Sequence, residues 1–197
     1  MKKDYPDIKL NQIIEVVENE KPYQLHKKTK STVQAHMVAF RENQIWLADL
    51  LDMSNYSKDN KGMKWILLVI DVFTRQCYAE SMKNIEKESA LSAFKKIIQE
   101  NGKPEKLITD NGSEFVNREF QKYLTDSQIF HETNEPQYHQ TLGLIDRLCR
   151  TIKEKIFKFF TDKNETNWAD HLQGIITAYN QRPHEALKDL SPQEASE

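Results

Sequence analysis

Apolar residues form several continuous runs of strand length along the chain. The runs at residues 44–53 and 65–73 are apolar on both faces, and a third run at 76–82 follows after a short turn. Such runs are typical of strands buried inside a sheet, and short connections join antiparallel neighbours, so we predict a meander with 65–73 as its central strand. Two further short strands are expected at 106–109 and 129–131.

A second pattern is helical, because apolar residues recur at intervals of three and four. It predicts helices over 86–100, 117–125, about 140–160 and 168–181, and a short amphipathic helix over 7–20. Strands interleaved with helices in this way favour an α/β fold.

Composition limits the possible organisation and partners. A length of 197 residues with 38% hydrophobic content supports one main domain, which we place at 44–197 behind an N-terminal arm or linker at 1–43. The net charge of −2 gives no overall positive field, so any nucleic-acid binding has to come from local clusters of Lys and Arg. The basic run at 26–31 is either a solvated linker or an arm that contacts phosphates.

Two cysteines provide neither a disulfide framework nor a four-ligand zinc site, which suits a reducing compartment. No apolar stretch is long enough to span a bilayer, and no signal-type segment follows the first residues. We therefore expect an intracellular protein without a membrane partner.

Three acidic residues are candidates for chemistry. Asp49 interrupts the first strand, Asp110 ends the fourth, and Asp146 lies near the start of the long helix. A carboxylate inside a sheet is costly unless a cation compensates it, and Mg²⁺ or Mn²⁺ prefers oxygen ligands. Two such ions can activate an attacking oxygen and stabilise a leaving one at a phosphodiester. The alternatives are a strand end at Asp49, an Asx-type turn at 110–112 and a helical ion pair between Asp146 and Arg150.

The long helix also carries positive charge on the face of Asp146. Arg150 and Lys153 follow this acid at intervals of four and three, so all three share one side of the helix. We expect both cations to contact DNA phosphates, the alternative being ordinary surface charges.

Three segments resemble the signature blocks of one family, the retroviral-type integrase catalytic core. They are WLAD at 46–49, TDNGSEF at 109–115 and GLIDRLCRTIK at 143–153. The resemblance implies a ribonuclease H-like fold with a five-stranded mixed sheet flanked by helices, and two aspartates and a glutamate that bind magnesium. In that family thirty-five residues separate the last two acids, as they do Asp110 and Asp146 here. The segments at 23–27 and 49–53 further resemble integrases of Maverick or Polinton elements and their virophage relatives.

The resemblance implies an integrase that processes the 3′ ends of element DNA and transfers them into target DNA. It also implies a homodimer or higher oligomer, located in the nucleus of a host cell or in a viral particle. From the residues, the apolar positions of the helices at 86–100 and 168–181 exceed what one sheet face needs, which is consistent with self-association. Without a zinc domain or a C-terminal tail, the chain is expected to be a fragment or an excised core.

Two departures from the family pattern bear on activity. Asp146 stands where the family has Glu and is one methylene shorter, so we expect weaker binding of the second metal. Cys149 stands where these cores commonly have Asn, so we expect a polar contact beside the site to be missing.

The departure at Asp146 leaves open an inactive or domesticated core that serves as a DNA-binding or dimerisation module. A nuclease of the same fold that acts on RNA–DNA hybrids is a further alternative. The segment RPHEAL at 182–187 argues against it, because this segment resembles integrases and transposases.

Overall fold

The computed structural model describes residues 37–133 and 142–196, within a compact unit that spans 35–197. The expected helix at 7–20 and the basic run at 26–31 lie outside the described residues.

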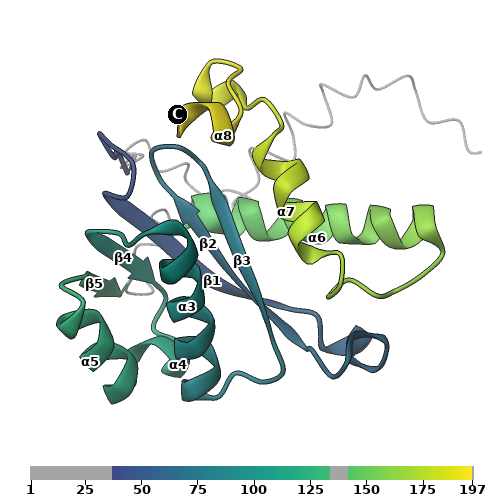
Figure 1. The fold of residues 1–197 in the computed structure, drawn as a ribbon, viewed down its shortest axis with the longest axis horizontal. Helices are drawn as coiled ribbons and strands as arrows, with labels where there is room; N and C mark the ends of the chain where they lie inside the picture. The colour runs from purple at the N-terminus through teal and green to yellow at the C-terminus, as the bar shows by residue number, and fades with distance from the viewer. Residues whose placement is uncertain (1–36, 134–141, 197) are drawn as a thin grey trace, which may run out of the picture. The chain divides into compact units, whose positions relative to one another are not determined.

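A five-stranded mixed sheet forms the centre of this unit, in the order β3-β2-β1-β4-β5 (Figure 1). The strand β1 pairs antiparallel with β2, and β2 with β3, whereas β4 runs parallel to β1 and β5 parallel to β4. The predicted meander and mixed sheet are confirmed: β2 lies between β1 and β3, and β1 is the middle strand of the whole sheet. The bounds are β1 Ile45–Asp52, β2 Trp65–Asp71, β3 Cys77–Met82, β4 Lys106–Thr109 and β5 Phe130–Thr133.

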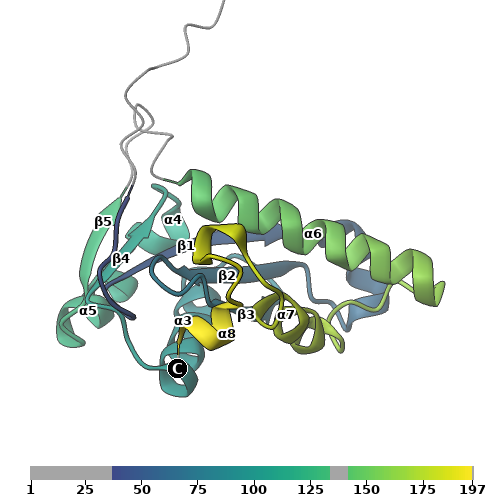
Figure 2. The same ribbon diagram turned by 90° about the horizontal axis from the view of Figure 1, so that it is seen from above.

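Helices cover both faces of the sheet. The helices α3 (Lys87–Asn101), α4 (Ser113–Val116) and α5 (Arg118–Asp126) pack on one face, and α6 (Gly143–Lys163) and α7 (Leu172–Asn180) on the other. Figure 2 shows α6 running along its side of the sheet. The short helices η1 (Ser54–Asn60), η3 (Glu185–Leu187) and α8 (Pro192–Ala195) complete the described elements, and of all the described helices none is long and apolar enough to cross a membrane.

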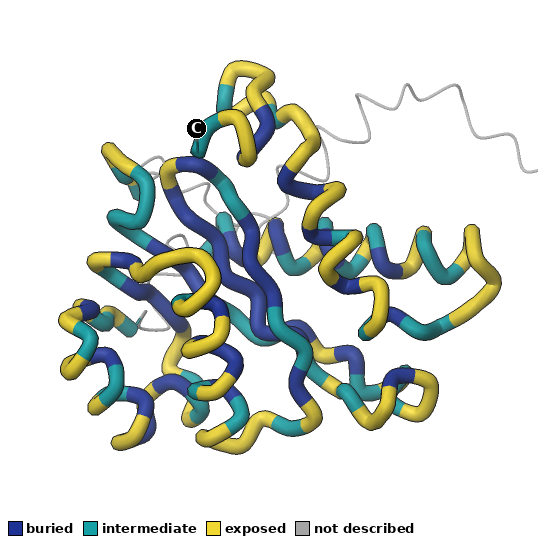
Figure 3. The backbone as a smooth tube through the Cα atoms, in the orientation of Figure 1, coloured by how far each residue is buried: buried dark blue, intermediate teal, exposed yellow. Residues whose placement is uncertain are grey.

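Alternation along β1 divides its side chains between two cores. Leu47 and Leu51 pack with α6 and α7, whereas Trp46 and Ala48 pack with α3, α4 and α5. Because successive side chains of a strand point to opposite faces, Asp49 shares the α6 face with Leu47 and Leu51. Figure 3 shows the inner strands buried along most of their length, which explains why their sequences are apolar on both faces.

The apolar residues of α3 and α7 are used inside this unit. Ala90, Phe94 and Ile97 are buried on one face of the sheet, and Leu172 and Ile176 on the other. The surplus of apolar residues that was expected on these two helices for self-association is therefore absent.

A buried acid that the sequence did not single out fixes the start of β1. Asp71 is fully buried at the end of β2, and its Oδ2 accepts hydrogen bonds from the Asn43 amide at 2.7 Å and from Trp46 Nε1 at 3.1 Å. Its Oδ1 accepts from the amides of Phe73 and Thr74, both at 2.8 Å. Since both carboxylate oxygens are satisfied, Asp71 has a structural role. It holds the start of β1 through Trp46, three residues before Asp49.

Candidate active site

Asp49 lies on β1 in a partly enclosed environment under α6. Its Oδ1 accepts a hydrogen bond from the Leu50 amide at 2.7 Å, and the thiol of Cys149 on α6 donates to its Oδ2 at 3.7 Å. Burial, together with the charges of Asp110 and Asp146, raises the pKa of Asp49 to about 6, although the two hydrogen bonds act in the opposite direction. The charges of Asp110 and Asp146 therefore reach Asp49, and a bound cation would stabilise the ionised form of Asp49.

Parallel strand pairing brings Asp110 to the level of Asp49. Leu47 of β1 is in register with Ile108 of β4, and the two acids each follow two residues later along parallel chains. Asp110 is exposed, and its Oδ1 accepts a hydrogen bond from the Gly112 amide at 3.0 Å. The Asx-type turn is thus present, and it holds the carboxylate just beyond the end of the strand.

Asp146 is exposed in the first turn of α6. The partial positive charge of a helix N-terminus favours a carboxylate at this position. Within the described part of α6, Asp146 and Arg150 form no ion pair, so the helical ion-pair alternative is wrong.

The donor chemistry of these acids fits a hard divalent cation, because all the ligand atoms they offer are carboxylate oxygens. No Lys, Arg or His is among the causes of the pKa shift of Asp49, so the negative charge at this residue also fits a bound divalent cation. Across residues 37–133 and 142–196, however, no three side chains of His, Cys, Asp or Glu lie close enough together to hold one ion. The structure thus brings the acids into each other's field without closing them around a common point.

Cys149 provides the polar contact that was expected to be missing. Its thiol lies one helical turn after Asp146 and donates a hydrogen bond to Asp49, whereas the family resemblance had led us to expect a lost polar contact here. Burial raises the pKa of this thiol, and the negative charge of Asp49 adds to the effect, so it remains a protonated donor at neutral pH. The expectation was wrong because a thiol can replace an amide as a weak hydrogen-bond donor.

The two expected DNA contacts lie on α6 beyond Asp146. Arg150 is exposed, and Lys153 is partly covered, with its Nζ 5.9 Å from the centre of the Phe157 ring. Hydrogen bonds from Ser54 lower the pKa of Asp52, and the charge of Lys153 lowers it further, which places this cation near the end of β1. Both side chains are thus positioned along the helix that carries Asp146.

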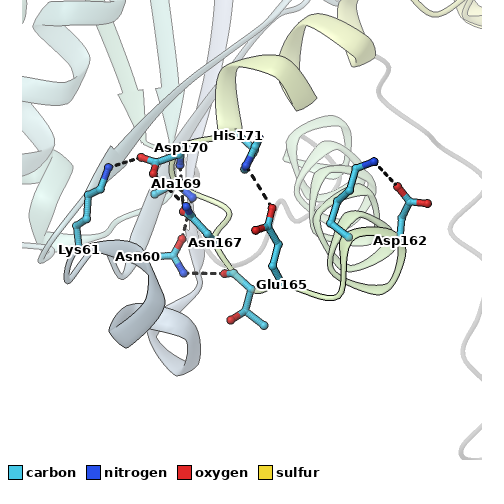
Figure 4. Close-up of polar contacts among 10 residues, drawn as sticks. Asn60, Lys61, Asp162, Glu165, Asn167, Ala169, Asp170 and His171 are labelled. Carbon is cyan, nitrogen blue, oxygen red and sulfur yellow. Dashed lines mark hydrogen bonds and ion pairs between the residues drawn. The ribbon is translucent and has the colours of Figure 1, made fainter.

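A polar clamp joins η1, which follows β1, to the connection between α6 and α7 (Figure 4). Asn60, at the end of η1 after β1, is fully buried, and its Nδ2 donates to the carbonyl of Thr166 at 2.8 Å in the connection between α6 and α7. Its Oδ1 accepts from the Ala169 amide at 2.8 Å, and its Nδ2 also donates to the Tyr56 carbonyl. No local pattern could indicate this residue, because its main partners lie more than a hundred residues away.

Comparison with known proteins agrees with this arrangement. A family model described as an integrase core domain matches residues 39–139, a range that contains Asp49 and Asp110 and ends before Asp146. A transposon-derived protein of Caenorhabditis elegans is 27% identical over 129 residues, which are 65% of this chain and 44% of that protein. The Gag-Pro-Pol polyprotein of sheep pulmonary adenomatosis virus is 25% identical over 118 residues, 60% of this chain and 7% of the polyprotein. The chain therefore spans less than half the length of these relatives.

Solved structures share the fold. The intasome of simian T-cell lymphotropic virus, in complex with a PP2A regulatory subunit, contains a chain that superposes with a TM-score of 0.75 at 19% identity, over 97% of this chain and 68% of that one. The catalytic core domain of HTLV-2 integrase, in complex with magnesium, superposes with a TM-score of 0.68 at 23% identity, over 81% of this chain and all of that one. The ribonuclease H-like fold is thus confirmed. Because the family model matches slightly more than half of the 197 residues, the protein belongs to the integrase core domain family, the cores of polynucleotidyl transferases.

Proposed function

We propose that this chain is the catalytic core of a DNA integrase, with Asp49, Asp110 and Asp146 as its catalytic acids. The observation that carries the proposal is the raised pKa of Asp49, caused by burial and by the charges of the other two acids. Two separate elements, the end of β4 and the start of α6, contribute these charges to the field at Asp49 on β1. The family model that matches residues 39–139 and the fold shared with the HTLV-2 integrase core support the proposal.

The proposed reactions are 3′-end processing and strand transfer. In the first, a water oxygen forms a bond to phosphorus near the end of the element DNA, the bond from phosphorus to the 3′ oxygen breaks, and the proton passes to that oxygen. In the second, the new 3′-hydroxyl oxygen bonds to a target phosphorus, and the target strand is released with its own 3′-hydroxyl. Both steps are in-line substitutions without redox change.

Magnesium or manganese is the proposed cofactor, held by Asp49, Asp110 and Asp146. Bound divalent ions supply activation of the attacking oxygen and stabilisation of the leaving oxygen. The chain itself orients the ligands: the Leu50 amide and the Cys149 thiol fix the two oxygens of Asp49, and the Gly112 amide fixes one oxygen of Asp110. A relative's core was solved in complex with magnesium, which supports this choice.

DNA is the proposed partner, bound through phosphates by Arg150 and Lys153. Both follow Asp146 on the same face of α6, so a phosphodiester held at the acids would have them beside it. For the whole protein we propose a homodimer or higher oligomer, since the HTLV-2 core was solved in dimeric and trimeric forms. The division into an arm at 1–43 and a core at 44–197, the Maverick-like or virophage-like origin, and a location in the host nucleus or a viral particle are proposals of the same kind.

The test uses a branched DNA that mimics the product of strand transfer, because reversal of that step needs no recognition of element ends. With Mg²⁺ or Mn²⁺, the wild-type chain should resolve the branched DNA, that is, separate element DNA from target DNA by reversing strand transfer. Asp49→Asn or Asp110→Asn should lower the rate of this reaction about a thousandfold or more. Asp162→Asn, which removes an exposed acid from the other end of α6, is the matched control.

Two results would reject the proposal. One is resolution of the branch at undiminished rate by both Asn variants. The other is wild-type chain that binds the DNA with either metal present but never cleaves it, which would favour the inactive core acting as a DNA-binding module.

A further inference from the structure

A side-chain bridge encloses the loop that presents Asp110. At the start of the loop, Thr109 Oγ1 lies 3.0 Å from His131 Nε2, and His131 Nδ1 lies 2.6 Å from Gln121 Nε2. At its end, the same Gln121 Nε2 donates to the carbonyl of Phe115 at 2.9 Å. Residues of β5 and α5 thus join the two ends of the segment 110–114, and we call this set of four residues the loop clamp.

The hydrogen bonds of the loop clamp can run in one direction only. Gln121 Nε2 carries two protons and donates one to Phe115, so it presents the other to His131 Nδ1, which has to accept. A neutral ring that accepts at Nδ1 carries its proton at Nε2, and this proton is donated to Thr109 Oγ1. The Thr109 hydroxyl is then free to donate to the carbonyl of Asp110, at 2.7 Å.

The surroundings of His131 hold this tautomer. Burial lowers the pKa of the imidazole, which keeps the ring neutral at pH 7. Its hydrogen-bond partners Thr109 and Gln121 are uncharged, and the ring of Phe120 lies nearby, with the two ring centroids 6.4 Å apart. The adjacent acid in β5, Glu132, pairs with Lys106 at 2.5 Å.

We infer that His131 is a positioning residue that fixes the loop carrying Asp110 by joining Thr109 to Gln121. The inference rests on the proposed function, because it matters for the reaction only if Asp110 is a catalytic acid. His131 touches none of the three acids and acts through the backbone of Asp110. An acid placed about 1 Å away from its productive position can lower a rate about a hundredfold, so a constraint on this loop has a direct effect on catalysis.

The first test needs no variant and no activity. Nitrogen chemical shifts of the imidazole in the full chain at pH 7, without metal, should show His131 as the neutral tautomer with its proton on Nε2. A proton on Nδ1, or a charged ring, would overturn the inference.

Matched variants test the two bonds of His131. His131→Phe keeps a ring but removes both bonds, whereas His131→Gln retains a donor near Thr109; Thr109→Val removes the hydroxyl, and Thr109→Ser retains it. His131→Phe and Thr109→Val should speed amide hydrogen exchange in 110–115 about tenfold, with exchange in α3 unchanged, and should slow resolution of branched DNA about 10- to 100-fold. The two variants that keep the donor or hydroxyl should recover most of both losses.

The outcomes separate this inference from the proposed function. Equal exchange in Thr109→Val and Thr109→Ser, or wild-type exchange in His131→Phe, overturns the loop clamp whatever the activity. If wild-type chain never resolves branched DNA, the proposed function fails, while the tautomer and the local exchange still decide whether the clamp exists. Thermal melting of each variant establishes that the fold is intact, and the tautomer of the wild-type chain decides the matter if a variant does not fold.

Discussion

At the scale of single residues, we propose that Asp146 limits the activity of the site. It is exposed at the start of α6 and is one methylene shorter than the Glu of the family pattern, so its carboxylate reaches less far towards Asp49. The lack of any three acids close enough to hold one ion, within the described residues, is consistent with this short reach.

We predict that Asp146→Glu raises the magnesium-dependent rate on branched DNA, by up to about a hundredfold if ligand placement limits the reaction. Manganese, which is less strict about geometry than magnesium, should narrow the difference between the variant and the wild-type chain. Rates measured with each metal in turn provide the check. An unchanged or lower rate with Asp146→Glu would mean that the natural site is built for Asp.

At the scale of elements, the polar clamp at Asn60 joins η1 to the connection between α6 and α7. The side chain is fully buried and makes three hydrogen bonds to backbone groups, two of them in the connection between α6 and α7. We predict that Asn60→Ala lowers the free energy of unfolding by about 2–4 kcal/mol, because it leaves buried backbone groups without partners. Urea denaturation measures this change.

The control for Asn60 is Lys61→Met, which removes only the exposed ion pair between Lys61 and Asp170. Exposed pairs contribute little because water screens them, so the midpoint of this variant should stay close to that of the wild-type chain. Equal losses in the two variants would show that the buried hydrogen bonds of Asn60 are not the important feature.

The same helix should bind DNA through its charges. We predict that changing both Arg150 and Lys153 to Gln weakens binding to all DNA sequences alike and lowers the slope of log affinity against log salt by about 2. Fluorescence anisotropy over a salt series measures both quantities, with Lys122→Gln on α5 as a control from the opposite face of the sheet. Unchanged affinity and slope would identify the two residues as plain surface charges.

At the scale of the whole molecule, the two faces of the sheet are already covered by the chain's own helices. The large apolar side chains that remain exposed include Phe40 at 78% and Phe130 at 64%, and none of this exposed set belongs to α3 or α7. Self-association therefore has to use other surfaces than the sequence argument suggested.

We still predict a dimer or larger species for the full chain, on the basis of the relatives' assemblies. Sedimentation velocity at micromolar concentration should show a mass above the 23.2 kDa of one chain. A single species at 23.2 kDa over a tenfold concentration range would contradict the prediction.

The sequence by itself determined the strands, the four longer helices and the three candidate acids. Burial imposes a period of two on strands and 3.6 on helices, and these periods are visible in one chain without its partners. Where the signal is short it failed: α4, η3 and α8, of three or four residues each, and η1, of seven, were not predicted, because so few positions show no period.

Tertiary structure alone decided which side chains meet. Asp49 and Asp110 lie at the same level because β1 and β4 pair in parallel register. The Cys149 thiol contacts Asp49 although a hundred positions separate them in the sequence. The contacts of Asn60 and His131 likewise join residues far apart in the chain. Periodicity reports that a residue is buried but carries no information on the atom that faces it, so hydrogen-bond partners and pKa shifts become visible only when the elements are packed together.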